Sequence, residues 1–252
     1  MAIPTETEVE ERLRTEDLDE WLRLWRVEQG PAKLPTLELM AGVIPARPGE
    51  RLRVLDLCAG PGDVGRVIHA RFPKSEVDAV DRDLFLTGLC RLANRRAGVL
   101  GRTLRRDLAA SDWMADLAGP YDVVAVANAL HWFSLERVKQ LLAEVMGLLR
   151  SGGIFLLMEP VSPAPPIAKA FAAWRASQPP QHRWEDWMAF WSRVNDFLGY
   201  DHIKALGDRN APHVGDSLTV TDWTELASDA GFVSTDVLLR DSEKVAIAAM
   251  RP

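Results

Sequence analysis

Short apolar runs alternate along the chain with segments in which apolar residues recur every three or four positions. Runs of this length are typical of strands, and the recurring spacing puts apolar side chains on one face of a helix. The runs are, in order, "RLRVLDLC", "SEVDAVDRD", "VLGRTLRRD", "YDVVAVANALHW" and "IFLLME". The fourth run does not alternate with polar residues, as expected of a strand buried on both faces. This alternation predicts an α/β fold with a doubly wound, mostly parallel sheet.

Helical segments flank and interrupt these runs. An amphipathic helix is predicted near the N-terminus, because four apolar residues share one helical face: Leu18, Trp21, Leu22 and Trp25. Gly30 and Pro31 stop that pattern. Ser134 suits the N-cap of a helix over residues 135–150, which the following "SGG" ends.

The pattern changes after the fifth run. A proline-rich turn, "PVSPAPP", precedes two tryptophan-rich helical stretches over residues 167–178 and 183–199. A capped helix over residues 221–232 follows, and then two strands over residues 233–241 and 243–250. The two strands are close enough in sequence to pair as an antiparallel hairpin.

These patterns fit one domain, since 252 residues are enough to bury a large core without a second one. We divide it into an N-terminal helical segment (1–50) and a core (51–160). A helical cap insertion (161–218) follows, and a C-terminal helix and hairpin (219–252) complete the sheet.

The charge of the chain limits its partners. The composition is that of a globular protein, with 47% hydrophobic and 26% charged residues, and the formal net charge is -6. An acidic molecule repels phosphate backbones and anionic lipid, so neither nucleic acid nor a membrane is an expected partner. One group of arginines is either an anion site or, as we favour, a solvated helix face and loop. Its members are Arg91, Arg95, Arg96, Arg102, Arg105 and Arg106.

Cysteine content and the N-terminal sequence favour the cytoplasm. Cys58 and Cys90 are the only cysteines; they are too few for a disulfide framework and lack metal-ligand spacing, so no metal is expected. The acidic N-terminal stretch does not have the pattern of a secretory signal. No apolar run approaches the roughly 20 residues that cross a bilayer. The sequence does not indicate an oligomeric state.

A glycine-rich segment, "AGPGDVG" at residues 59–65, joins the first predicted strand to a helix and has the spacing G-x-G-x-x-G. Such a loop exposes backbone N–H groups beside the positive end of a helix dipole, and its glycines let a ligand lie on the backbone. Asp81 follows about 20 residues later, where a ribose-binding acid is expected. The loop therefore suits either a dinucleotide pyrophosphate or an adenosine with a charged tail.

The acids beside this loop favour the second ligand. Asp56 and Asp63 flank the glycines and would repel a pyrophosphate. A carboxylate can instead hold the ammonium group of S-adenosylmethionine. The last glycine, Gly65, can equally be a helix residue at a crowded helix–strand contact.

Five segments of the chain resemble the ordered motifs of class I S-adenosylmethionine-dependent methyltransferases: "VLDLCAGPGD", "VDAVDRD", "RRDL", "VVAVANALHW" and "LLRSGGIFLLME". The resemblance covers Leu52 to Glu159 and extends loosely to the terminal helix and hairpin, which are similar to the family's reversed last strand. It implies a Rossmann-like methyltransferase fold with a seven-stranded sheet and S-adenosylmethionine as cofactor. Cys58 stands where the family usually has its first glycine, and we favour a space-filling role for it over a nucleophilic one.

The resemblance also implies a set of cofactor-binding residues. Asp56 would orient the loop and, through water, the ammonium group, while Asp81 would accept both ribose hydroxyls because a carboxylate offers two acceptors. Arg82 would flank the adenine, and Asp107 with the backbone of Leu108 would meet its amino edge. The alternatives are an exposed turn acid for Asp81 and an ordinary loop acid for Asp107. The full set is Asp56, Cys58, Ala59, Gly60, Pro61, Gly62, Asp81, Arg82, Asp107, Leu108 and Asn128.

The acceptor side of the site is expected to be aromatic. His131 is the candidate general base, because imidazole titrates near neutrality; its alternative role is to shape the loop. Trp187 and Trp191 lie four residues apart on one helical face, which either packs the insertion or lines an apolar pocket. We expect Trp132, Trp187 and Trp191 to bind the acceptor.

The predicted function is methyl transfer from S-adenosylmethionine to a small, apolar or aromatic molecule. One alternative is an NAD(P)-dependent oxidoreductase that uses the same glycine loop, and another is a noncatalytic S-adenosylmethionine-binding protein. A nucleic-acid methyltransferase is disfavoured by the charge and by "NALH", which is a poor substitute for an N-P-P-Y motif.

Overall fold

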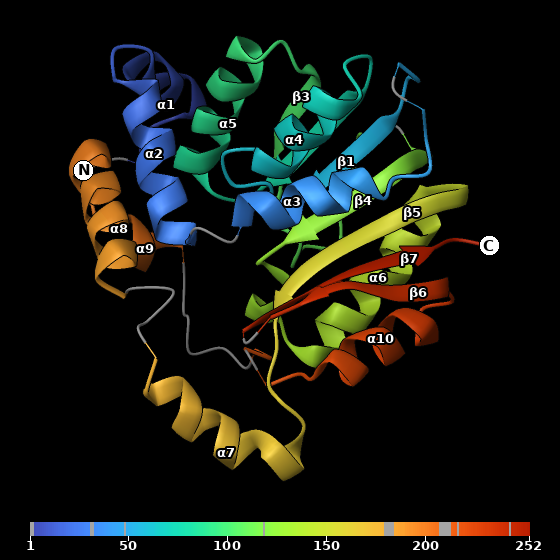
Figure 1. Ribbon diagram of the computed structural model, residues 1–252. Helices are drawn as coiled ribbons and strands as arrows, with labels where there is room; N and C mark the ends of the chain where they lie inside the picture. Colours follow the sequence, from blue (N-terminus) through green and yellow to red (C-terminus); the bar gives the residue numbers. More distant parts are fainter. Residues whose placement is uncertain are drawn as a thin grey trace.

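The computed structural model of the protein confirms the predicted sheet (Figure 1). It describes residues 3–30, 33–47, 49–117, 119–178, 184–206, 213–215, 217–241 and 243–252. Seven strands lie in the order β3-β2-β1-β4-β5-β7-β6. They are β1 (Arg53–Leu57), β2 (Glu76–Asp81), β3 (Leu100–Arg105), β4 (Tyr121–Ala127), β5 (Leu149–Pro160), β6 (Val233–Arg240) and β7 (Lys244–Met250). The first five strands pair in parallel, and β7 pairs antiparallel with both β5 and β6.

Helices cover both faces of the sheet, as expected of a doubly wound fold. The helices are α1 (Glu6–Leu13), α2 (Leu18–Gln29), α3 (Lys33–Gly42), α4 (Asp63–Arg71), α5 (Leu84–Arg96), α6 (Leu135–Leu148), α7 (Pro165–Ala176), α8 (Trp184–Leu198), α9 (His202–Ala205) and α10 (Val220–Asp229). Helices α3 and α4 share one apolar core with the sheet, and α6 and α10 share the other (Figure 1). None of the described helices is both long and apolar enough to span a membrane.

Helices α1 and α2 pack against α5 and α8 rather than against the sheet. Helix α1 lies along α5, and α2 lies beside α8 (Figure 1). Trp21 on α2 is 1% exposed, and its ring lies 4.8 Å from Phe85, 6.2 Å from Phe190 and 5.8 Å from Phe197, measured between ring centroids. This aromatic cluster joins the N-terminal segment to the insertion that follows β5.

The two helices predicted for the insertion occupy different places. Helix α8 joins α2, whereas α7 extends away from them beyond the end of β5 (Figure 1). An ion pair between Arg175 on α7 and Glu243 ties α7 to the start of β7. Trp174 on α7 is 49% exposed, so the tryptophans of this region do not share one buried surface.

Capping residues explain most of the helix starts. Ser134 caps α6 as predicted, with its side chain accepting a hydrogen bond from the backbone N–H of Arg137. The predicted end of α6 was wrong: "SGG" does not follow the helix as a loop, since β5 already begins at Leu149. A shift of register between Tyr121 and Val123 lets β4 pair with this early part of β5. Helix α1 was not predicted, although Thr5 and Glu8 form a capping box at its start.

Most of the predicted arginine group is paired with carboxylates. Arg91, Arg95 and Arg96 on α5 form ion pairs with acids of the N-terminal helices α1 and α2. Arg102 pairs with Asp78, and Arg106 pairs with an aspartate of the loop after β3. These contacts hold α1 and α2 against the core and lower the positive charge that this region presents.

The junction of β1 and α4 depends on a buried carboxylate and a glycine. Asp56 is 0% exposed, and its Oδ2 accepts a hydrogen bond of 2.9 Å from the backbone N–H of Gly65. A Cβ atom on Gly65 would lie 2.8 Å from Cγ1 of Val77. Gly65 is therefore a helix residue at a crowded helix–strand contact, as one of the two interpretations of this glycine held.

We predict that Gly65→Ala destabilises the protein by about 1–3 kcal/mol, because the new methyl group overlaps Val77. Gly147→Ala on α6 is the matched control: its Cβ meets nothing within 4 Å, so it changes stability by less than about 1 kcal/mol in the favourable direction. Urea unfolding followed by tryptophan fluorescence measures both. Equal stability of the two variants would contradict the crowding.

A second prediction concerns pH. Burial raises the pKa of Asp56 to about 7, although the Gly65 hydrogen bond opposes this rise. Because the pKa of Asp56 is higher in the folded than in the unfolded protein, the acid ionises first in the unfolded state as the pH rises, and this favours unfolding. Relative to Asp56→Asn, which does not titrate, the free energy of unfolding of the wild type should therefore fall by up to about 4 kcal/mol between pH 4 and pH 7. Urea unfolding of both proteins across this range tests it, and a difference that does not vary with pH would contradict it.

Candidate cofactor and acceptor site

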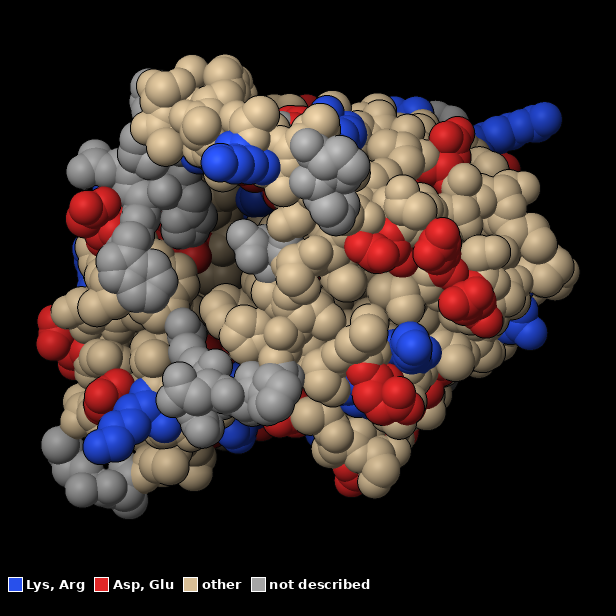
Figure 2. Space-filling model, turned by 90° about the horizontal axis from the view of Figure 1, so that it is seen from below, with Lys and Arg blue, Asp and Glu red and all other residues tan. Residues whose placement is uncertain are grey.

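A pocket of about 370 Å³ lies at the carboxyl ends of β1, β2 and β4. This edge is where open α/β sheets bind ligands, because the strand order reverses there. The molecular surface seen in Figure 2 is hollowed, and charged side chains of both signs are scattered over that face. Three groups of residues form the pocket: the ends of the strands, the N-terminal helices α2 and α3, and helix α8.

The glycine loop forms the first part of the lining. Three of its residues have positive φ angles, namely Cys58 (49°), Gly60 (53°) and Gly62 (87°), which turn the chain from β1 into α4. Cys58, Ala59 and Gly60 line the pocket. Burial raises the pKa of the Cys58 thiol, which supports the space-filling role over the nucleophilic one.

Three of the predicted cofactor residues are not part of this lining: Asp56, Pro61 and Gly62. Asp56 lies beneath the loop, bonded to Gly65. Gly62 packs behind the loop, since a Cβ atom there would lie 2.7 Å from Sγ of Cys90. Asp56 and Gly62 therefore act on the shape of the loop from outside the pocket lining.

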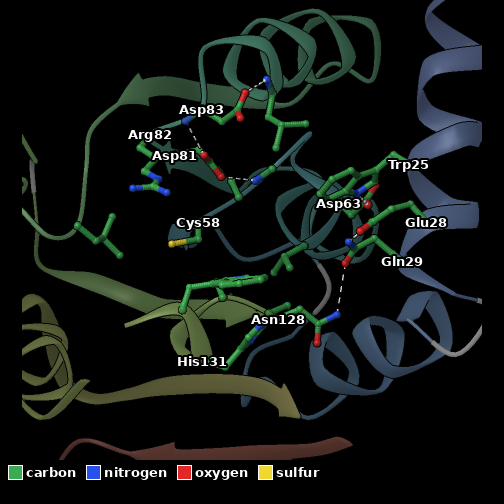
Figure 3. A pocket seen from close by; sticks show the side chains of 18 of the residues that line it. Trp25, Glu28, Gln29, Cys58, Asp63, Asp81, Arg82, Asp83, Asn128 and His131 are labelled. Atoms are coloured by element: carbon green, nitrogen blue, oxygen red, sulfur yellow. Dashed lines mark hydrogen bonds between the residues drawn. The ribbon is translucent and has the colours of Figure 1, made fainter. Parts of the chain in front are cut away.

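Asp81 lies at the centre of the pocket wall, at the end of β2 (Figure 3). It is 9% exposed, so it is not the exposed turn acid of the alternative interpretation. Its Oδ2 accepts from the backbone N–H of Gly60 at 2.8 Å, and its Oδ1 accepts from that of Asp83 at 2.8 Å. Burial raises the pKa of Asp81 to about 6.

The backbone donors of the glycine loop are largely used within the protein. The N–H of Gly60 bonds to Asp81 and that of Gly65 bonds to Asp56. The N–H of Gly62 bonds to the carbonyl of Ala59 at 2.8 Å. A pyrophosphate would have to compete with two carboxylates for these donors, which disfavours a dinucleotide.

Arg82, Asp107 and Leu108 line the pocket beyond Asp81. The Arg82 guanidinium and the Asp107 carboxylate are 3.7 Å apart, and both side chains are about half exposed. Leu108 is buried. This end of the pocket therefore combines an apolar floor with a polar, solvent-facing rim.

The loop after β4 brings Asn128, His131 and Trp132 to the same pocket. His131 lies in a 3₁₀ turn over Leu130–Trp132, and its Nδ1 is 2.8 Å from Oε2 of Glu159. Glu159, at 0% exposed, also accepts hydrogen bonds from the backbone N–H groups of Ala129 and Leu130. With Nδ1–H donated to Glu159, the Nε2 atom of neutral His131 is an acceptor.

Helix α8 contributes aromatic side chains to the pocket. Trp187 and Trp191 both line it, and their ring centroids are 6.1 Å apart. Trp191 also packs against Phe190, at 5.1 Å between centroids, and is 7% exposed. These rings therefore pack the insertion and line the pocket at once, so the two interpretations of this helical face do not exclude each other. Trp132, across the pocket, is 50% exposed.

Helices α2 and α3 add residues that sequence reasoning did not assign to the site: Glu28, Gln29 and Lys33. Asp63 and Lys244 were also missed as lining residues. A signal for Glu28 was present, because it continues the buried face of Trp21 and Trp25 at helical spacing although it is charged. An acid on the apolar face of a helix indicates a buried polar site.

Comparison with known proteins agrees with this geometry. Residues 54–153 match the family model of the methyltransferase domain. The 3-hydroxy-5-methyl-1-naphthoate 3-O-methyltransferase of Streptomyces sahachiroi is 32% identical over 108 residues, which are 42% of this chain and 30% of that protein. The matched part is thus less than a third of the relative's length.

Two solved structures share the fold over most of the chain. An O-methyltransferase family protein from Burkholderia thailandensis has a TM-score of 0.59 and 15% identity, covering 86% of this chain and 55% of that one. Human N-acetylserotonin methyltransferase, solved in complex with S-adenosylmethionine, has a TM-score of 0.52 and 15% identity, covering 85% and 50%. The chain spans about half the length of each. Residues 54–153 thus match a methyltransferase domain, and the seven-stranded topology agrees with the fold that these solved methyltransferases share with this chain.

Proposed function

We propose that the protein transfers the methyl group of S-adenosylmethionine to a hydroxyl group of a small aromatic acceptor. The observation that supports this most is the continuity of the pocket. Asp81 and the glycine loop line one part of it, and His131 with three tryptophans lines another. A methyl donor and an acceptor bound in one such pocket can be aligned for direct transfer, and alignment supplies much of the rate of this reaction.

The residues of the first part fit the cofactor. The carboxylate oxygens of Asp81 each accept one backbone hydrogen bond and have further lone pairs for the two ribose hydroxyls. Leu108 offers an apolar surface to adenine, with Arg82 and Asp107 at its polar edge. The methionine end then lies over Cys58, Ala59 and Gly60 and points toward Asn128. When bound, the cofactor supplies a methyl group activated by the positive sulfur.

The residues of the second part fit an aromatic acceptor. Trp132, Trp187 and Trp191 offer aromatic surfaces on more than one side of the pocket, and such sites bind flat apolar molecules. The relative from Streptomyces is named for the methylation of a hydroxyl group on a naphthoate. This name favours oxygen over nitrogen or carbon as the atom that receives the methyl group.

In the proposed reaction His131 takes the proton of the acceptor hydroxyl. Glu159 fixes the ring through Nδ1 and leaves Nε2 to accept the proton, and the buried carboxylate stabilises the imidazolium that forms. The alternative is that Glu159 uses His131 only to hold the loop after β4. That nucleic acid is not a partner stays a prediction.

Calorimetric titration with S-adenosylmethionine, S-adenosylhomocysteine and NADH tests the cofactor assignment. We expect the first two to bind and NADH not to bind. Release of S-adenosylhomocysteine in the presence of hydroxynaphthoates and simpler phenols then tests turnover. A protein that binds the cofactor but methylates none of a broad acceptor panel would be the noncatalytic alternative, and binding of NADH alone would support the oxidoreductase.

We predict that Asp81→Ala weakens S-adenosylhomocysteine binding more than about tenfold, because charge-assisted hydrogen bonds to the ribose are lost. Asp78→Asn is the control, since Asp78 lies on the same strand but faces Arg102 and Tyr121 instead of the pocket. In the wild type the affinity should fall as the pH decreases through about 6, where Asp81 becomes protonated. Unchanged affinity in Asp81→Ala would show that the ribose binds elsewhere.

We predict that His131→Ala lowers turnover by about 10²-fold or more while the affinity for S-adenosylhomocysteine stays within about twofold. His69→Ala, on α4 outside the pocket lining, is the control for loss of an imidazole. Initial rates at saturating cofactor and calorimetry measure the two effects. If turnover is unaltered, His131 has only the structural role.

A further inference from the structure

The wall formed by α2 and α3 lies outside the segment that matches the methyltransferase family, residues 54–153. It nevertheless touches the glycine loop. Nε1 of Trp25 donates a hydrogen bond of 3.0 Å to Oδ2 of Asp63, the first residue of α4. A Cβ atom on Gly60 would lie 3.0 Å from the Trp25 ring, so the indole covers this glycine closely.

Lys33, at the start of α3, brings a positive charge to this contact. Its Nζ atom donates to Oε1 of Gln29 at 2.9 Å and lies 5.0 Å from the centroid of the Trp25 ring. Oδ2 of Asp63 is 3.9 Å from Nζ, too far for a hydrogen bond. The Lys33 side chain is 11% exposed and lines the pocket.

The ammonium group of Lys33 contacts two side chains, Trp25 and Gln29, that reach different parts of the pocket. On one side Trp25 connects it to Gly60, and on the other side Oε1 of Gln29 is 3.3 Å from Nδ2 of Asn128 (Figure 3). Lys33 therefore lies beside the gap between the glycine loop and the end of β4. The proposed function places the methionine end of the cofactor in that gap.

Lys33 forms a long ion pair with Asp63, whose Oδ2 is 3.9 Å from Nζ, and it shares this carboxylate with other groups. Asp63 already accepts from Trp25 and forms an ion pair with Arg66 at 2.5 Å. Burial lowers the pKa of Lys33, while the nearby acids Asp63 and Glu28 oppose this decrease. An anion that bound beside Nζ would offset the cost of burying the ammonium group.

The other cations of the described pocket lining have different surroundings. Arg82 faces Asp107, and Arg106 forms an ion pair with Asp116. Lys244 is close enough to four acids, Asp241, Glu243, Glu28 and Glu159, for each of them to oppose the lowering of its pKa by burial. Lys33 is the lining cation that contacts both Gln29 and the Trp25 ring beside the glycine loop, where the proposed function places the methionine end with its carboxylate.

We propose that Lys33 binds the carboxylate of the cofactor's methionine end. The N-terminal helices then complete the cofactor site, and the site distinguishes the full cofactor from adenosine derivatives that lack the amino-acid group. Glu28 and Asn128, on the same side of the pocket, offer oxygen acceptors to the cofactor's ammonium group. This inference rests on the proposed function, because it takes the position of the cofactor from it.

Two ligands that differ at this end test the inference. S-adenosylhomocysteine carries the amino-acid group, and 5′-methylthioadenosine lacks it. We expect Lys33→Met to weaken S-adenosylhomocysteine binding about 10- to 100-fold, as the loss of a charge-assisted contact implies. Binding of 5′-methylthioadenosine should change less than about twofold, and Lys33→Arg should restore most of the affinity for S-adenosylhomocysteine.

Lys139→Met, which removes an exposed lysine of α6, controls for the change in net charge. Thermal unfolding shows whether each variant is folded; if Lys33→Met is not, Lys33→Gln replaces it. Equal weakening of both ligands, or no weakening of either, would overturn the role of Lys33 while leaving the proposed function intact. Failure of the wild type to bind S-adenosylhomocysteine would instead overturn the proposed function and this inference with it.

Discussion

The hydrogen bonds that two buried aspartates accept from the glycine loop determine the shape of the site. Asp56 holds Gly65 at the start of α4, and Asp81 holds Gly60 in the middle of the loop. Both acids are charged only at the expense of desolvation, so their N–H partners are what makes their burial tolerable. The loop is therefore fixed by the protein itself, with the backbone curved and Gly60 in the lining of the pocket. A ligand has no need to order it.

The same loop is fixed from outside by α2, and α2 is fixed by α8. Trp25 contacts Gly60 and Asp63 on one side and Phe190, at 5.4 Å between ring centroids, on the other. Trp191 follows Phe190 directly and lines the pocket. A displacement of α8 would thus move both the aromatic lining and the indole that covers the loop. In the proposed function, this packing couples the shape of the acceptor pocket to that of the cofactor pocket.

The sheet and the cofactor half of the site could be predicted because their signals are local in sequence. Strands buried on both faces are continuous apolar runs, and Cys58, Asp81 and Asn128 each follow such a run closely. Residues at the carboxyl ends of neighbouring parallel strands must meet at one edge of the sheet. The packing of α2 on α8 could not be predicted, because it depends on contacts between segments about 170 residues apart, such as Arg193 with Glu20. Gln29 and Lys33 were missed because their places likewise depend on contacts far apart in sequence, with Asn128 and with Asp63.

Which residues of the glycine loop line the pocket could not be predicted from the sequence either. Asp56, Pro61 and Gly62 belong to the same motif as Ala59 and Gly60, yet only the latter two line the pocket, because the chain turns at Cys58, Gly60 and Gly62, where the φ angles are positive. A motif gives the spacing of residues but not which of them face a ligand. For Asp56 the distinction changes its role: it is buried beneath the loop, and its effect on a cofactor acts through the backbone it holds.

The charges around the pocket affect how strongly the methyl donor would bind relative to the product of the proposed reaction. Asp81, Asp63, Glu28 and Glu159 all lie in or beside the pocket, and two of them are buried in the sheet edge. In the proposed function these acids would stabilise a positive sulfur more than a neutral one, because a buried acid is stabilised by a nearby cation, while Lys33, Arg82 and Lys244 of the same lining would weaken the preference. Methyl transfer removes the positive charge of the sulfur, so S-adenosylhomocysteine loses an attraction that S-adenosylmethionine had. The proposed contact of Lys33 is with the amino-acid group, which donor and product share, so it would bind both alike and leave the discrimination between them to the surroundings of the sulfur atom.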